Sequence, residues 1–143
     1  MRRLFAAVAL GAAAAAIAGC GGPSADLFVV TRSGSIPGAR LTMLVGDGGT
    51  VRCNGGKELE LTSKQLIDAR KITFQLNGDD KDPGPATRNV RLPAGPVTIL
   101  RYVVRSEKGT VAFSDTSPRQ PPAFYRVAKL TRDLAKGVCG LPR

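Results

Sequence analysis

The sequence predicts an α+β domain in which one antiparallel sheet of about five strands carries two helices on a single face. Two stretches of short β-branched runs, at residues 40–54 and 97–114, each enclose a glycine-containing turn and are typical of β-hairpins. A segment with apolar residues at helical spacing follows each stretch, at residues 62–77 and 121–137, and indicates a helix. Two successive strand–turn–strand–helix units favour helices gathered on one side of a shared sheet.

The first strand is expected at residues 27–32, an apolar and β-branched run. Residues 33–38 follow with two glycines and one proline, a composition typical of a loop. Residues 40–45 alternate between two sets of side chains, as a strand does when one of its faces is buried. The start of the domain is therefore expected to be strand, loop, strand.

The first hairpin turns at residues 46–49, Gly-Asp-Gly-Gly, because a positive φ costs glycine no steric penalty. The returning strand is expected at residues 50–54 and carries Cys53. The tripeptide Gly-Thr-Val occurs at residues 49–51 and again at residues 109–111. It is common in hairpins and does not by itself indicate a duplication.

The first helix is expected to begin at Thr62 or Ser63, because either hydroxyl can accept a backbone hydrogen bond as an N-cap. The Asn-Gly pair at residues 77–78 is a signal for the end of a helix. The apolar stripe of this helix consists of Leu66, Ala69, Ile72 and Leu76. Residues 78–96 are rich in proline, glycine and aspartate and are expected to form a long irregular connection.

The second hairpin is expected to begin with a strand at residues 97–105, which are rich in valine, isoleucine, leucine and tyrosine. Residues 106–109, Ser-Glu-Lys-Gly, turn the chain back into a strand at residues 110–114.

The second helix is expected after a proline-rich segment at residues 117–122. Pro121 or Pro122 can occupy its first turn, where the missing N–H of proline would have no helical partner. Gly137 ends it. The buried stripe of this helix is expected to be Phe124, Val127, Leu130 and Leu134.

The first twenty residues have the pattern of a secretory leader. Two arginines precede an apolar and small-residue run at residues 4–17, as in a signal peptide. The alternative is a transmembrane anchor, but this run falls short of the about 20 apolar residues that span a bilayer.

The end of the leader, Ile-Ala-Gly-Cys at residues 17–20, resembles the lipobox of bacterial lipoproteins, with Ile17 where leucine is commoner. The resemblance implies a signal peptide at residues 1–19 and a diacylglyceryl group on Cys20. Residues 20–26 would be the lipidated cysteine and a tether, and residues 27–143 a single extracytoplasmic domain. The protein is then expected to be lipid-anchored to the cell membrane, with no cofactor besides this lipid.

If Cys20 carries lipid, Cys53 and Cys139 remain as a pair in an oxidising compartment, which favours a disulfide between them. The alternative is two separate buried thiols.

The mature chain is basic. The sequence has 21 Lys and Arg, two of which lie in the leader, against 11 Asp and Glu, which leaves a net charge of +8. Such a charge suggests affinity for anionic lipid, wall polymer or an acidic protein, and the alternative is that it only maintains solubility. Nucleic acid is not an expected partner of an exported protein with few aromatic residues. The candidate basic surface consists of Arg119, Arg126, Lys129, Arg132 and Lys136.

No catalytic or metal site is expected. The chain has no histidine, so the usual Ser–His and Cys–His nucleophile pairs cannot be assembled. Asp79, Asp80 and Asp82 form the one acidic cluster, but their spacing departs from that of a calcium loop and suits a solvated loop. A non-enzymatic binding role remains, with an oligomeric state that the sequence does not indicate.

The residues after the tether suggest what such a module binds. The strand that runs into Arg-Ser-Gly at residues 28–38, the Tyr-Val-Val at residues 102–104 and the later Gly-Thr-Val and Ser-Asp resemble the emfourin family, bacterial inhibitors of thermolysin-type (protealysin-like) metalloproteases. In this chain Ser35 replaces the second glycine of the family's loop, Pro37 stiffens it, and an extra hairpin with Cys53 precedes the first helix.

The resemblance implies that one loop enters the cleft of a protease, and glycines with an apolar tip suit such a close backbone approach. The alternative is that the loop is a plain connection between strands. The candidate binding loop consists of Arg32, Ser33, Gly34, Ser35, Ile36, Pro37 and Gly38.

Overall fold

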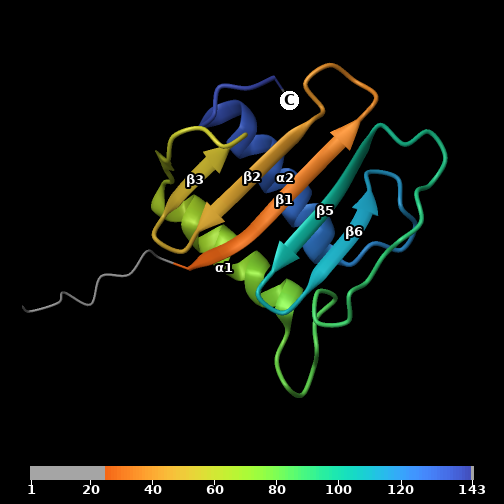
Figure 1. The fold of residues 1–143 in the computed structure, drawn as a ribbon. Helices are drawn as coiled ribbons and strands as arrows, with labels where there is room; N and C mark the ends of the chain where they lie inside the picture. The colour runs from red at the N-terminus through yellow and green to blue at the C-terminus, as the bar shows by residue number, and fades with distance from the viewer. Residues whose placement is uncertain (1–24, 143) are drawn as a thin grey trace, which may run out of the picture.

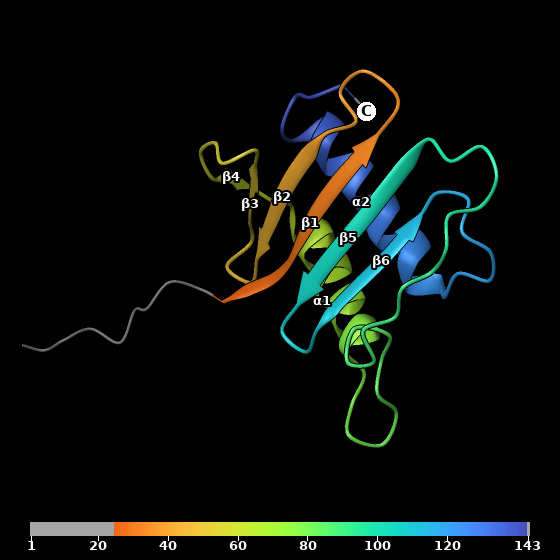
Figure 2. The ribbon, with the colours of Figure 1, turned by 45° about the vertical axis from the view of Figure 1, so that its right-hand side comes forward.

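The computed structural model describes residues 25–142, so the predicted leader and the predicted lipidation at Cys20 lie outside the described residues. Six strands form one antiparallel sheet in the order β4-β3-β2-β1-β5-β6. Two helices cover the same face of this sheet (Figures 1 and 2). The predicted α+β class is confirmed. The elements are β1 (Asp26–Gly34), β2 (Leu41–Gly46), β3 (Thr50–Cys53), β4 (Leu59–Glu60), α1 (Ser63–Asn77), β5 (Leu100–Ser106), β6 (Thr110–Ser114) and α2 (Pro122–Gly137).

The sheet has six strands, whereas the sequence predicts about five. The additional strand is β4. This strand has two residues, Leu59 and Glu60, too few to produce an alternating pattern in the sequence. It exists because the chain passes beside β3, where Val51 pairs with Leu59. A very short edge strand leaves few open backbone groups for another chain to pair with.

Both helices begin and end where the sequence predicts. Gln65 donates its backbone N–H to the Thr62 hydroxyl, and Thr62 donates its own N–H to the Gln65 side chain, which forms a capping box at the start of α1. Gly78 follows the last residue of α1 with a φ of 65°, a conformation that glycine adopts without a steric penalty. Pro122 is the first residue of α2, and Gly137 is the last.

The core lies between the sheet and the two helices. The four residues predicted for the α2 stripe are buried, and in α1 Ala69, Ile72 and Leu76 are buried while Leu66 is half-buried. Three aromatic rings stack through this core: Tyr102 on Phe113 with centroids 5.1 Å apart, and Phe113 on Phe124 at 4.5 Å. The stack therefore joins β5, β6 and α2.

The predicted disulfide between Cys53 and Cys139 is confirmed. Cys53 ends β3, and Cys139 lies two residues beyond α2. The Cα atoms are 6.3 Å apart although 86 residues separate the two cysteines in the chain. The bridge thus ties the tail that follows α2 to the sheet.

Two predicted strand boundaries are wrong by more than one residue. The strand expected from residue 97 begins only at Leu100, because Gly95 and Pro96 direct the chain into a turn that contains Val97, and these turn residues override the β-propensity of valine. The first strand does not stop at Arg32, where its pairing with β2 ends, but continues to Gly34, because β5 still pairs with it there, Gly34 with Leu100.

The connection between α1 and β5 is irregular, as predicted, but it also covers an edge of the sheet. Arg91 forms a parallel bridge with Ala112 of β6, and Leu92 donates its N–H to the Ala112 carbonyl at 2.8 Å. The outer edge of β6 is thereby paired, which limits edge-to-edge association.

Within residues 25–142, neither helix is long and apolar enough to span a bilayer.

Candidate functional site

The candidate loop connects β1 to β2 and is built around one tight turn. Ser35 donates its N–H to the Ile99 carbonyl at 3.1 Å, and Ala39 donates its N–H to the Ile36 carbonyl at 3.1 Å. Pro37 occupies the second position of this turn and Gly38, with a φ of 75°, occupies the third, which is the pattern of a type II turn. The backbone of the loop therefore has a defined conformation.

Arg32 lies beneath the loop and not on its surface. Its side chain is 1% exposed, because residue 32 continues the alternation that places Phe28 and Val30 on the helix-covered face of the sheet. The guanidinium donates from Nε to the Ala39 carbonyl at 2.8 Å and from Nη2 to the Gly38 carbonyl at 3.1 Å. Hydrogen bonds from a charged donor are the stronger ones, so Arg32 holds the turn from inside the protein.

The C-terminal tail holds the same turn from another side. A Cβ atom on Gly38 would lie 2.9 Å from Cγ of Pro142, so Pro142 packs directly on this glycine. Leu141 donates its N–H to the Ala135 carbonyl at 2.8 Å, and the disulfide at Cys139 constrains the tail just upstream. The turn is braced both by the buried arginine and by the disulfide-linked tail.

The outer surface of the loop is exposed and carries one apolar side chain at its tip. Ile36 is 39% exposed, and Ser33, Gly34, Ser35, Pro37 and Gly38 are also exposed. The adjoining segment before β5 adds Val97 and Ile99, which are 86% and 42% exposed. We call Ile36, Val97 and Ile99 the apolar tip. The two segments that carry it, the connection from β1 to β2 and the segment that enters β5, lie at the end of the sheet opposite the start of β1 (Figure 1).

The sequence predicts the loop but not the second segment of the apolar tip, because the composition of residues 97–99 favours a strand. The Gly95-Pro96 pair was the signal that could have indicated a turn there. The alternation through residue 32 was likewise the signal that Arg32 is buried.

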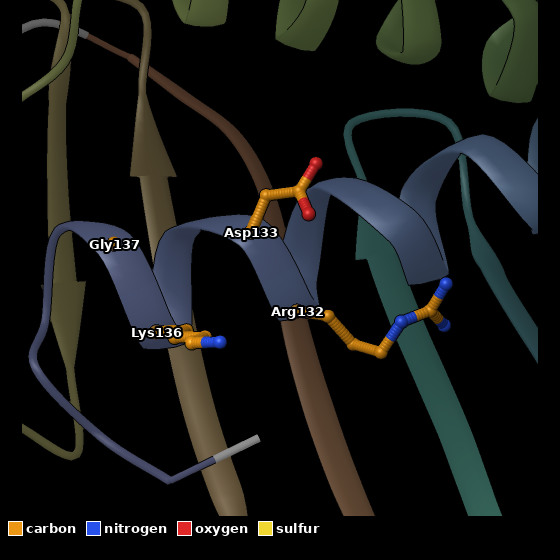
Figure 3. A pocket seen from close by; sticks show the side chains of 4 residues that line it. All are labelled: Arg132, Asp133, Lys136 and Gly137. Atoms are coloured by element: carbon orange, nitrogen blue, oxygen red, sulfur yellow. The ribbon is translucent and has the colours of Figure 1, made fainter.

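The predicted basic surface is divided between a helix and a loop. Arg126, Lys129, Arg132 and Lys136 are exposed on α2, whereas Arg119 lies in the loop before it with a φ of 54°. A shallow hollow at the end of α2 is lined by Arg132, Asp133, Lys136 and Gly137 (Figure 3). In this view the Asp133 carboxylate extends on the opposite side of the helix from the two cationic side chains.

A groove between α1 and α2 mixes both charges. Each of its two acids is paired with a lysine four residues away, Asp68 with Lys64 and Asp133 with Lys129. The hydrogen bond to Asp68, together with the charge of that carboxylate, raises the pKa of the Lys64 ammonium above its ordinary value. Exposed pairs of this kind contribute little stability. The helix layer thus presents cations to solvent, and none of the charged side chains that line this groove is buried.

The acidic cluster after α1 forms part of a turn. Asp79 Oδ1 accepts the backbone N–H groups of Lys81 and Asp82, both at 2.8 Å. Over the described residues, no group of three or more cysteine, aspartate or glutamate side chains could hold a metal ion.

No protein-family model, curated protein or solved structure matches this chain. The resemblances to bacterial lipoproteins and to emfourin therefore stay predictions.

Proposed function

We propose that this protein is a lipid-anchored, extracytoplasmic binding module without catalytic activity. In this proposal it inhibits a thermolysin-type metalloprotease by inserting the turn at residues 36–39 of the candidate loop into the protease cleft, as the resemblance to emfourin implies. The observation that carries the proposal is the combination of a backbone braced by Arg32 with an exposed apolar side chain, Ile36, at its tip.

Bracing matters because a flexible loop loses conformational entropy when a partner orders it, and this loss weakens binding. Here the turn is held before any partner arrives by its internal hydrogen bond, by the bond from Ser35 to Ile99, and by the guanidinium of Arg32. A plain strand connection has no need of a buried charged side chain for support, since burying a charge is costly unless it is well hydrogen-bonded. The buried arginine therefore favours a loop whose conformation serves binding over a plain connection between strands.

The position of the loop also suits a membrane-anchored inhibitor. β1 has nine residues and rises about 3.3 Å per residue, so its two ends lie about 25–30 Å apart. The tether would join the domain at the first end, and the apolar tip lies at the second. A partner could therefore approach the tip from the side facing away from the membrane.

The test of the inhibitor is a titration of the full chain, solubilised in a mild detergent, against a thermolysin-type metalloprotease. We expect stoichiometric inhibition by the wild type. Ile36→Asp should weaken inhibition about 100-fold, equivalent to about 2.7 kcal/mol, because it places a charge in an apolar contact.

Ile67→Asp is the matched control, since Ile67 is 62% exposed on α1 and receives the same chemical change away from the loop. It should inhibit like the wild type. No inhibition at micromolar protein, together with salt-sensitive binding to acidic liposomes, would instead favour the basic surface of α2 as the site of function.

The anchor is tested separately at Cys20. Cys20→Ala is expected to release the protein from the membrane fraction or to leave the leader uncleaved, because the thiol that would receive the lipid is absent. Membrane fractionation and mass spectrometry of the N-terminus measure both results. Unchanged membrane association with a normally processed N-terminus would contradict the lipoprotein prediction.

A further inference from the structure

Val97 has an unusual backbone conformation and an unusual exposure. Its φ is 56°, and a positive φ in a β-branched residue is a genuine outlier, because the branched side chain crowds the neighbouring carbonyl. The side chain is 86% exposed, so burial of apolar surface does not offset this strain. Glycine or asparagine would adopt the same conformation more easily. Folding alone therefore gives no reason for a valine at this position.

The surrounding structure holds this turn firmly. Thr98 Oγ1 donates to the Gly95 carbonyl at 2.9 Å and lies 2.7 Å from Thr116 Oγ1. The next two N–H groups, those of Ile99 and Leu100, donate to the Asp115 carboxylate. Strained residues persist where their surroundings over-determine them, and they concentrate at binding sites.

This turn and the candidate loop belong to the same end of the molecule. Ser35 is hydrogen-bonded to Ile99, and a Cβ atom on Gly34 would lie only 2.2 Å from the Ile99 carbonyl oxygen, so the two segments are in direct contact. Both views show the two connections at the same end of the sheet (Figures 1 and 2). Each turn has proline at its second position and a positive φ at its third, Gly38 in one and Val97 in the other.

Cations outnumber carboxylates around the apolar tip, two arginines against Asp115. Arg40 and Arg101 are exposed next to the two turns, and residues 33–40 and 95–101 contain no acidic residue. The carboxylate that reaches this end, that of Asp115, accepts backbone hydrogen bonds. Charge complementarity therefore favours a partner whose apolar cleft has an acidic rim.

We propose that Val97 is a second specificity-determining contact of the inhibitor. Its side chain enters an apolar pocket of the protease cleft, beside the pocket that receives Ile36. This inference rests on the proposed function and extends it from one turn to two. The strained turn holds the valine side chain away from the domain, where it is available to the partner and contributes nothing to the core.

The experiment compares inhibition of the same metalloprotease by the full chain and by Val97→Asn. Asparagine tolerates a positive φ, so the turn should persist and the melting temperature should stay equal or rise. Inhibition should weaken roughly tenfold or more, because the complex loses the free energy gained by burying the valine side chain. Val103→Thr is the control, because Val103 is 41% exposed in the middle of β5, away from the apolar tip. This variant should inhibit like the wild type.

Three results would overturn the inference. If Val97→Asn inhibits as well as the wild type while Ile36→Asp does not, the one-turn inhibitor stands and the second contact is wrong. If Val97→Asn weakens inhibition and also lowers the melting temperature, Val97 supports the loop and does not contact the partner. If the wild type itself does not inhibit, the proposed function fails, and the inference fails with it.

Discussion

Replacement of both Cys53 and Cys139 by serine is expected to lower the free energy of unfolding by about 4–5 kcal/mol, because the bridge closes a loop across 86 residues and restricts the unfolded chain accordingly. The total free energy of unfolding of a native protein is about 5–15 kcal/mol, so the variant should be close to unfolding at 37 °C. The melting temperature should fall by about 15 °C or more. Urea or thermal unfolding followed by circular dichroism measures both quantities.

The reduced wild type is the control for this variant, since it removes the same bridge without changing the side chains. Both proteins should unfold at nearly the same temperature, and the oxidised wild type should show no thiol from either cysteine on titration. A double variant within 1 kcal/mol of the oxidised protein would contradict the entropic account. The bridge also constrains the tail that packs on Gly38, so its loss removes one of the two supports of the candidate loop.

Phe124→Ala is expected to cost about 3–5 kcal/mol of stability, the range typical of a buried phenylalanine. Phe124 is 0% exposed and stacks on Phe113, which in turn stacks on Tyr102. Truncation leaves a cavity where α2 meets β5 and β6, and it removes a ring contact worth more than its buried area alone. Urea unfolding measures the loss as a lowered midpoint with an unchanged slope.

Tyr125→Ala is the matched control for this second change. Tyr125 is the next residue of α2 but is 59% exposed, so its truncation should alter stability by no more than about 0.5 kcal/mol. Equal losses for the two variants would mean that the helix packs with a different face on the sheet.

The local elements of this fold were predictable from short stretches of sequence. The Gly-Asp-Gly-Gly turn, the cap at Thr62 and the end of α1 at Asn77 depend on residues within a few positions of one another, and local chemistry decides such features. The strand at Leu59 and Glu60 was not predictable in this way, because it exists only through pairing with β3. The turn at Val97 is a different case, because its signal is local: the Gly95-Pro96 pair directly before it prevailed over the β-propensity of valine.

By itself, the sequence determined the α+β class, both hairpins and both helices with most of their buried stripes, because periodicity and turn chemistry are properties of the chain alone. The chain has three cysteines, so the sequence favoured the pairing of Cys53 with Cys139 only on the expectation that Cys20 carries lipid, and the structure decided it. Only the tertiary structure decided that Arg32 lies beneath the loop and that residues 95–99 join residues 33–39 at one end of the sheet. The physical reason is that β1 lies between β2 and β5, and the register with β5 brings Gly34 against Leu100. Contacts between segments so distant in the chain follow from strand order, which periodicity does not specify.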